Sequence, residues 1–207
     1  EGILLVHNEV PSSFSLTYDH EQQLTLRTDV DNRVVFLEPY KSLYVDGTFY
    51  IPNEQQWNVC KSVWQLDLKM KELIISDEQK NTFFSEVVPI LKEVTDVKID
   101  EEVTEEVVEY PLRATLYLKE KDDAIIGELA YHYGAYTFDP FRNTEPTEKI
   151  VIRDIAKEDE IMDLIEQSNF HYNGEDLYIH LENDEDVYEF LYVILPLLAD
   201  KVELYLS

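Results

Sequence analysis

Two stretches of the chain, 107 residues apart, show the same order of residue types. Residues 77–94 read DEQKNTFFSEVVPILKEV, and residues 184–201 read DEDVYEFLYVILPLLADK. Each begins with acidic residues, continues with apolar residues at helical spacing, and has a proline (Pro89 or Pro196) at the same place. A proline inside a helix costs about 3 kcal/mol and bends it, so its recurrence favours two copies of one helix. We therefore expect two helices that each bend over a sheet of their own.

Similar strand patterns surround the two helices. Apolar and polar residues alternate in residues 14–20 and 24–28, and again in residues 113–118 and 125–133, which predicts two pairs of strands. Two Xaa-Gly pairs, at Asp46-Gly47 and Asn173-Gly174, predict hairpin turns. The sequence therefore predicts an α+β protein with two similar lobes from an internal duplication. Each lobe is expected to be a small, mainly antiparallel sheet covered by helices.

An acidic segment separates the predicted lobes. We expect a first α+β lobe over residues 1–100, an acidic linker over 101–111 and a second α+β lobe over 112–207. Residues 96–109 hold seven carboxylates and one lysine. This run is interpreted as a solvated linker or exposed helix, or alternatively as a docking surface for a basic partner or a cation site.

The overall charge limits the possible partners. The 207 residues include 44 Asp and Glu against 17 Lys and Arg, for a net charge of −27, while 44% hydrophobic residues indicate a folded core. The charge is even, with −13 in residues 1–109 and −14 in residues 110–207. Such a surface repels phosphate backbones and anionic lipid headgroups. We therefore expect neither direct DNA binding nor membrane binding by this chain.

Residue patterns for common catalytic chemistry are missing from the sequence. The five glycines are too far apart to form a phosphate-binding loop, so the isolated chain is expected not to bind ATP. The single cysteine, Cys60, excludes an internal disulfide and a cysteine-based zinc cluster, and fits a reducing cytosol. His171 and His180 flank a predicted hairpin and favour a cross-strand pair over a metal site. We expect no catalytic, cofactor-binding or metal-binding residues.

Two local groups are candidates for contact with a partner. Residues 131–136, followed by Asp139, form either a turn with core aromatic residues or an aromatic contact patch. At Arg153-Asp154, either Asp154 caps a helix whose Lys157 and Glu158 face solvent, or Arg153 points outward as an anchor for an acidic group. The candidate contact residues, including two acids of the last helix, are Tyr133, Asp139, Arg153, Asp154, Glu158, Asp184 and Glu185.

Several of these stretches together carry a resemblance to a known family. In the second half they are Tyr133-Gly134, Asp139-Pro140, Val151 to Asp154 with Lys157-Glu158 and Ile161, Phe170 with Gly174 and Tyr178, and Tyr188 to Leu191 with Leu195-Pro196 and Leu198. In the first half they are Tyr50 to Pro52, Phe84 to Glu86 with Leu91, and Val97 to Asp100. Their order and spacing resemble the helicase-associated domain of bacterial Swi/Snf-family proteins.

The resemblance implies a place beside a motor. In that family the domain lies between an N-terminal zinc-binding SWIM finger and a C-terminal two-lobed ATPase motor. It thus implies a non-catalytic accessory or regulatory domain of a DNA-dependent helicase or translocase, docking on the motor or other proteins. ATP and Mg are expected only in the motor, and the parent protein is expected in the cytoplasm, associated with the nucleoid. The start at Glu1 fits a piece of a longer chain.

Two other functions compete with this hypothesis. The chain is alternatively a free-standing acidic protein-binding module, or a nucleic-acid mimic presented to a basic protein. A hydrolase that uses carboxylates, with or without a divalent metal, is a third reading. Carboxylate pairs carry little information here, because 44 acidic residues bring many of them close by chance.

Overall fold

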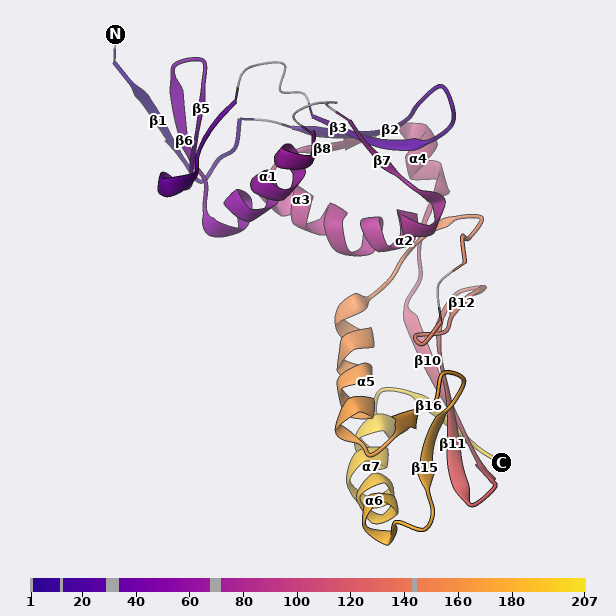
Figure 1. Ribbon diagram of the computed structural model, residues 1–207. Helices are drawn as coiled ribbons and strands as arrows, with labels where there is room; N and C mark the ends of the chain where they lie inside the picture. Colours follow the sequence, from indigo (N-terminus) through magenta and orange to yellow (C-terminus); the bar gives the residue numbers. More distant parts are fainter. Residues whose placement is uncertain (1, 12, 29–33, 68–71, 143–144) are drawn as a thin grey trace. The chain divides into compact units, whose positions relative to one another are not determined.

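The computed structural model describes residues 2–11, 13–28, 34–67, 72–142 and 145–207 (Figure 1). The chain divides into two compact units, Glu1–Val108 and Glu109–Ser207, and each is described by itself. Strand β9 (Val107–Glu109) runs across the boundary.

Unit 1 contains two sheets and a group of helices. Its elements, in chain order, are β1 (Leu4–His7), β2 (Phe14–Tyr18), β3 (Leu24–Thr28), β4 (Val35–Leu37), the 3₁₀ turn η1 (Glu38–Tyr40), β5 (Ser42–Val45), β6 (Thr48–Ile51), α1 (Glu54–Asp67), β7 (Glu72–Ile75), the 3₁₀ turn η2 (Asp77–Gln79), α2 (Lys80–Thr82), the π-helical turn η3 (Phe83–Val87), α3 (Val88–Val94), β8 (Val97–Ile99) and α4 (Glu101–Glu106).

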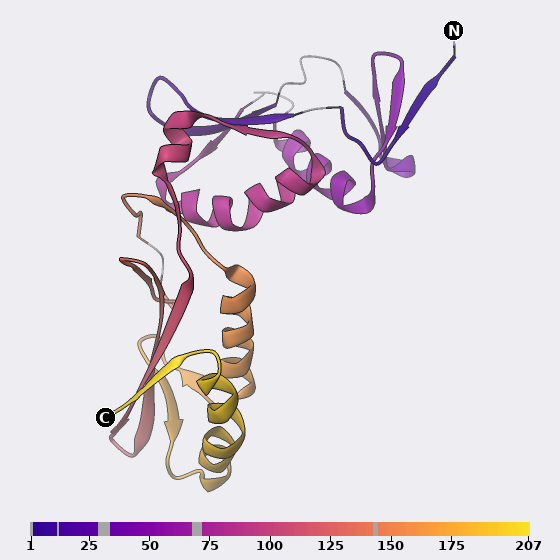
Figure 2. The ribbon, with the colours of Figure 1, turned by 180° about the vertical axis from the view of Figure 1, so that it is seen from behind.

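The main sheet of unit 1 has the strand order β7-β3-β2-β8. Strand β2 pairs antiparallel with β3 and parallel with β8, and β3 pairs antiparallel with β7. Helices α1, α2 and α3 lie along one face of this sheet in both views (Figures 1 and 2). The second sheet, β1-β6-β5-β4, contains the predicted turn at Asp46-Gly47, where both residues have positive φ. That turn is confirmed.

Unit 2 is built around one long hairpin. Its elements are β10 (Leu112–Lys121), β11 (Ala124–Tyr133), β12 (Tyr136–Phe138), β13 (Ile150–Ile152), α5 (Ile155–Gln167), β14 (His171–Tyr172), β15 (Leu177–His180), α6 (Asp184–Glu189), the π-helical turn η4 (Phe190–Ile194), α7 (Leu195–Ala199) and β16 (Glu203–Leu206).

The sheet of unit 2 has the order β14-β15-β11-β10-β16, with β12 paired to β11. Leu116 of β10 lies opposite Leu129 of β11, and both are buried. Phe190, Ile194 and Leu198 of the last helix are also buried. Helices α5, α6 and α7 lie on one side of this sheet in both views (Figures 1 and 2), so the core of unit 2 lies between one face of the sheet and these helices.

The main sheets of the two units have the same plan. In each, an antiparallel hairpin (β2–β3 or β10–β11) is flanked by an antiparallel strand on one side. On the other side, the last strand of the unit pairs parallel with the first strand of that hairpin. The predicted α+β class is confirmed. The internal duplication stays a prediction, with which this shared strand order agrees.

Both predicted proline helices contain a π-helical turn directly before the proline. The N–H of Val88 donates to the carbonyl of Phe83, and the N–H of Leu195 donates to the carbonyl of Phe190, each a five-residue step. Such a turn changes the regular helical ladder one residue before a proline that has no N–H to donate. The matched prolines therefore follow matched backbone features.

The acidic run contains a helix, which is one of the alternatives expected for it. Residues 101–106 form helix α4 in unit 1, and Val103 of this helix is fully buried. The boundary between the units falls after Val108, while the division into 1–100, 101–111 and 112–207 stays a prediction. Leu191 of the last helix is 41% exposed. Phe84, at the matching position of the helix in unit 1, is buried. The exposure of this position therefore depends on the elements that pack beside each helix and not on the geometry of the helix itself.

Candidate functional site

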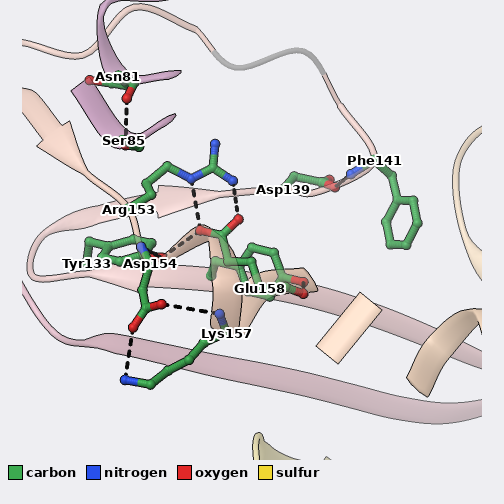
Figure 3. Close-up of polar contacts among 10 residues, drawn as sticks. Asn81, Ser85, Tyr133, Asp139, Phe141, Arg153, Asp154, Lys157 and Glu158 are labelled. Atoms are coloured by element: carbon green, nitrogen blue, oxygen red, sulfur yellow. Dashed lines mark hydrogen bonds and ion pairs between the residues drawn. The ribbon is translucent and has the colours of Figure 1, made fainter. Parts of the chain in front are cut away.

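A buried ion pair joins the end of β13 to helix α5. Arg153 follows β13, and its Nε and one terminal nitrogen donate to the two carboxylate oxygens of Glu158, over 2.9 and 2.5 Å (Figure 3). The Arg153 side chain is 14% exposed and that of Glu158 is 7% exposed. The Arg153 guanidinium also lies 4.7 Å from the centre of the Phe138 ring. This two-pronged geometry fixes both side chains.

Two tyrosines of β11 complete the group. The Tyr133 hydroxyl donates to Oε1 of Glu158 over 2.6 Å and accepts the backbone N–H of Asp154 over 2.8 Å. The Tyr131 hydroxyl donates to the backbone carbonyl of Glu158 over 3.2 Å. Residues 131 and 133 alternate with the partly exposed His132, so both tyrosines point from one face of β11. The group therefore connects β11, β13 and α5 inside unit 2.

The surroundings keep both tyrosines protonated. Burial raises the pKa of Tyr133 above its ordinary value, and the hydrogen bond to Glu158 raises it further. Burial, followed by the charge of Glu158, likewise raises the pKa of Tyr131. An ionised phenol would lie next to a carboxylate in a site with little water, which disfavours its charged form.

Asp154 begins helix α5 as its N-cap residue. Its Oδ1 accepts the backbone N–H of Lys157 over 3.2 Å, and its Oδ2 lies 2.9 Å from the Lys157 ammonium. The side-chain hydrogen bond with Lys157 lowers the pKa of Asp154, and the backbone N–H lowers it further. The predicted cap is therefore confirmed.

Of the two side chains expected on the solvent face, Lys157 is 67% exposed, as expected. The expectation for Glu158 is wrong, because Glu158 is buried where it pairs with Arg153. The alternative placed Arg153 outward as an anchor, but Arg153 points inward at that same carboxylate. Tyr133 is fully buried. These three residues thus have a structural role, and contact with a partner at this segment is open to Asp154, whose side chain is 37% exposed.

The remaining predicted contact residues lie in other parts of unit 2. Asp139 follows β12 and accepts the backbone N–H of Phe141 over 2.9 Å (Figure 3), with Arg142 at 3.2 Å from its other oxygen. Asp184 and Glu185 are exposed in the first turn of α6. The structure therefore joins Tyr133, Arg153, Asp154 and Glu158 by hydrogen bonds. Asp139 directly follows Phe138, whose ring contacts Arg153, and Asp184 and Glu185 lie on a different element, α6.

The predicted pairing of the two histidines is wrong. His171 lies opposite Tyr178 in the sheet, and His180 lies opposite Ala124. The Tyr178 ring contacts both imidazoles, at 5.7 Å from His171 and 5.0 Å from His180. The pairing register therefore places an aromatic ring between the two histidines.

A cavity of about 600 Å³ lies beside these histidines. It is lined by Asn169, His171, His180 and residues 182–186. Among the described residues, no three histidine, cysteine or acidic side chains are grouped closely enough to hold a metal ion.

Across all residues that the structure describes, no helix is long and apolar enough to cross a membrane.

The sequence of the chain matches a known protein family over its full length. The family described as "Bacterial SNF2 helicase associated" matches residues 1–207. The chain belongs to this family. A search of curated proteins gives no match. The family membership covers both units, so the resemblance seen in the sequence is confirmed for the whole chain.

This SNF2 helicase-associated chain also has a close contact that the sequence does not reveal. Gly134 has a φ of +60°, and a Cβ placed on it would lie 3.0 Å from the ring of Tyr110. Glycine is therefore favoured at position 134 both by its backbone conformation and by the aromatic ring packed against it. No local pattern marks Tyr110, because it is separated from Gly134 by the whole β10–β11 hairpin.

The last helix of the SNF2 helicase-associated chain also has exposed apolar residues that were not predicted from the sequence. Several large apolar side chains of residues 188–197 are exposed. The exposed ones are Tyr188, Leu191, Tyr192, Val193 and Leu197. Phe190, Ile194 and Leu198 alone, four residues apart, are enough to form the buried side of the helix. The sequence therefore contains more apolar residues here than a single buried side needs, and this surplus is the signal for an exposed apolar surface.

Proposed function

We propose that this chain is a non-catalytic accessory domain of a bacterial SNF2-type DNA-dependent ATPase, and that it docks on the motor of its parent protein. The observation that carries the proposal is the family match over all 207 residues. The name of that family places its members in association with a helicase. ATP and Mg then belong to the motor, and the parent works on DNA in the cytoplasm.

The charge of the chain supports docking on the motor. A motor that tracks DNA needs lysine and arginine along its DNA-binding groove, because these residues neutralise phosphates. A domain with a net charge of −27 is attracted to such a surface. Tethering within one protein raises the effective concentration to the order of mM, so weak complementarity is enough for docking.

Acidic residues of both units are candidates for this contact. In unit 1, Glu101 and Glu102 are exposed on α4. In unit 2, Asp184 and Glu185 are exposed at the start of α6. Docking through such residues competes with DNA for the same basic groove, which restrains ATP turnover until DNA displaces the domain.

The test compares the parent protein with and without residues 1–207. ATPase turnover without DNA is measured over a salt series. Deletion is expected to raise this basal turnover, and most strongly at low salt, where attraction between opposite charges is least screened. Unchanged or lower basal turnover contradicts the restraining role. The alternative, a free-standing acidic module or nucleic-acid mimic, requires a gene that encodes no motor beside this domain.

A further inference from the structure

The last helix of unit 2 has large apolar side chains exposed outside its buried side. The helix runs through α6, η4 and α7, and it buries Phe190, Ile194 and Leu198. Its exposed apolar residues are Tyr188, Leu191, Tyr192, Val193 and Leu197, which we call the tyrosine surface. Tyr188 and Tyr192 are 62% and 68% exposed, and their ring centres lie 4.7 Å apart. Two large, neighbouring aromatic rings thus point away from the core.

The fold of the unit does not require apolar residues at these positions. The helix of unit 1, matched residue by residue at the spacing of 107, has Asn81, Ser85 and Glu86 in place of Tyr188, Tyr192 and Val193. That helix buries the same inner side, with Phe83 and Leu91 in the core. Ser85 donates a hydrogen bond to the carbonyl of Asn81 over 2.6 Å (Figure 3). Asn81 is buried and Ser85 is half-buried, so this side of the helix is covered in unit 1, whereas Tyr188 and Tyr192 are exposed in unit 2. The same helix-on-sheet plan forms with polar residues at these positions, and the exposed tyrosine rings add nothing to the core of unit 2.

Negative charge surrounds the tyrosine surface. Residues 182–200 contain six carboxylates and no lysine or arginine. Glu185 lies three residues before Tyr188, and Glu189 lies three residues before Tyr192, so both acids neighbour the rings along the helix. A partner for this surface therefore needs an apolar centre with lysine or arginine around it.

Charge also decides between the possible occupants. A second copy of the chain would bring its own acidic rim against this one, and nucleic acid or an anionic membrane would be repelled. A basic protein surface fits. We infer that the tyrosine surface is the contact by which this chain binds the basic motor of its SNF2 parent, an inference that rests on the proposed function. Tyrosine is among the residues that contribute most at such contacts.

The experiment titrates the labelled chain with the purified ATPase motor of the same parent protein and measures Kd by fluorescence anisotropy. The double substitution Tyr188→Ser/Tyr192→Ser is compared with Tyr40→Ser, which removes a tyrosine that is 78% exposed on unit 1. The double variant is expected to bind at least tenfold more weakly, and Tyr40→Ser within twofold of the unmodified chain. Circular dichroism melting confirms that both variants are folded.

Each other outcome overturns a distinct statement. If the double variant binds the motor as tightly as the unmodified chain, the tyrosine surface is not the contact, and the domain docks on the motor through other residues. If the unmodified chain does not bind the motor at low salt, both the proposed docking on the motor and the assignment of the tyrosine surface as its contact are wrong. If the chain instead forms a dimer that the double substitution abolishes, the occupant is a second copy and the motor contact is wrong.

Discussion

The hydroxyl of Tyr133 lies 2.6 Å from Oε1 of Glu158, and both side chains are buried. Since Glu158 also accepts two hydrogen bonds from Arg153, one carboxylate joins a strand end, a loop and a helix. A charge buried in this way is stable only while its partners remain. Three of the seven candidate contact residues, Tyr133, Arg153 and Glu158, are therefore held together inside unit 2.

Removing the charge of Glu158 is expected to destabilise unit 2 strongly. Glu158→Gln leaves the Arg153 guanidinium buried without its counter-ion, which costs about 3–5 kcal/mol in the free energy of unfolding. Lys157→Gln removes an exposed, solvent-screened ion pair with Asp154 and is expected to have a much smaller effect. Urea unfolding of the two variants measures the difference. Equal losses would show that the buried pair has no special role.

Alkaline pH is expected to weaken the fold through the buried tyrosines. The pKa of Tyr133 is raised in the folded chain, so above its ordinary value of 10.0 the unfolded chain loses a proton that the folded chain keeps. The free energy of unfolding then falls by about 1.4 kcal/mol per pH unit for such a tyrosine, and below pH 10 it does not change on this account.

The substitution Tyr133→Phe removes this contribution, although it also removes a hydrogen bond. The slope of unfolding free energy against pH, measured from pH 9.5 to 11, is expected to become less steep than in the unmodified chain. A slope unaffected by Tyr133→Phe would contradict the raised pKa.

Two glycines with positive φ allow a matched test of the Tyr110 contact. Gly134 has Tyr110 packed against it, whereas an added Cβ at Gly174 meets nothing within 4 Å. Both Gly→Ala variants have the backbone cost of a positive φ, about 1–2 kcal/mol. Gly134→Ala is expected to be the more destabilising by urea unfolding, and Tyr110→Ala in the same chain is expected to remove the excess. Equal losses in the two single variants would show that the ring tolerates the methyl group.

The features that could be predicted from the sequence are those that depend on local interactions. The Asp46-Gly47 turn and the Asp154 cap each depend on residues a few positions apart, and both are found in the structure. Prediction failed where burial depends on distant strands: Glu158 is buried because β11 and β13 place Tyr133 and Arg153 over it. Helical spacing alone contained no information on that packing.

Salt is expected to stabilise the chain. With a net charge of −27 divided almost evenly between the halves, carboxylates repel one another over the whole surface, and added ions screen this repulsion. The melting temperature is therefore expected to rise between low and physiological ionic strength. A melting temperature that stays constant or falls would mean that the charges are already compensated, for example by bound cations.

The matched prolines allow a test of whether the π-helical turns depend on them. Pro89 and Pro196 follow turns closed by Val88 N–H to Phe83 and by Leu195 N–H to Phe190. Alanine at either position restores a backbone donor but also raises the entropy of the unfolded chain, which costs about 0.4–1 kcal/mol. Because the two effects oppose each other, Pro89→Ala and Pro196→Ala are each expected to change unfolding free energy by less than about 1 kcal/mol.

Phe190→Ala provides the scale for this comparison, because it empties a fully buried position of the same helix and is expected to cost about 3–5 kcal/mol. Hydrogen exchange of the Val88 and Leu195 amides then reports whether the turns persist. If Pro196→Ala keeps its melting curve but loses binding to the motor, the tyrosine surface depends on Pro196 and the packing of unit 2 does not.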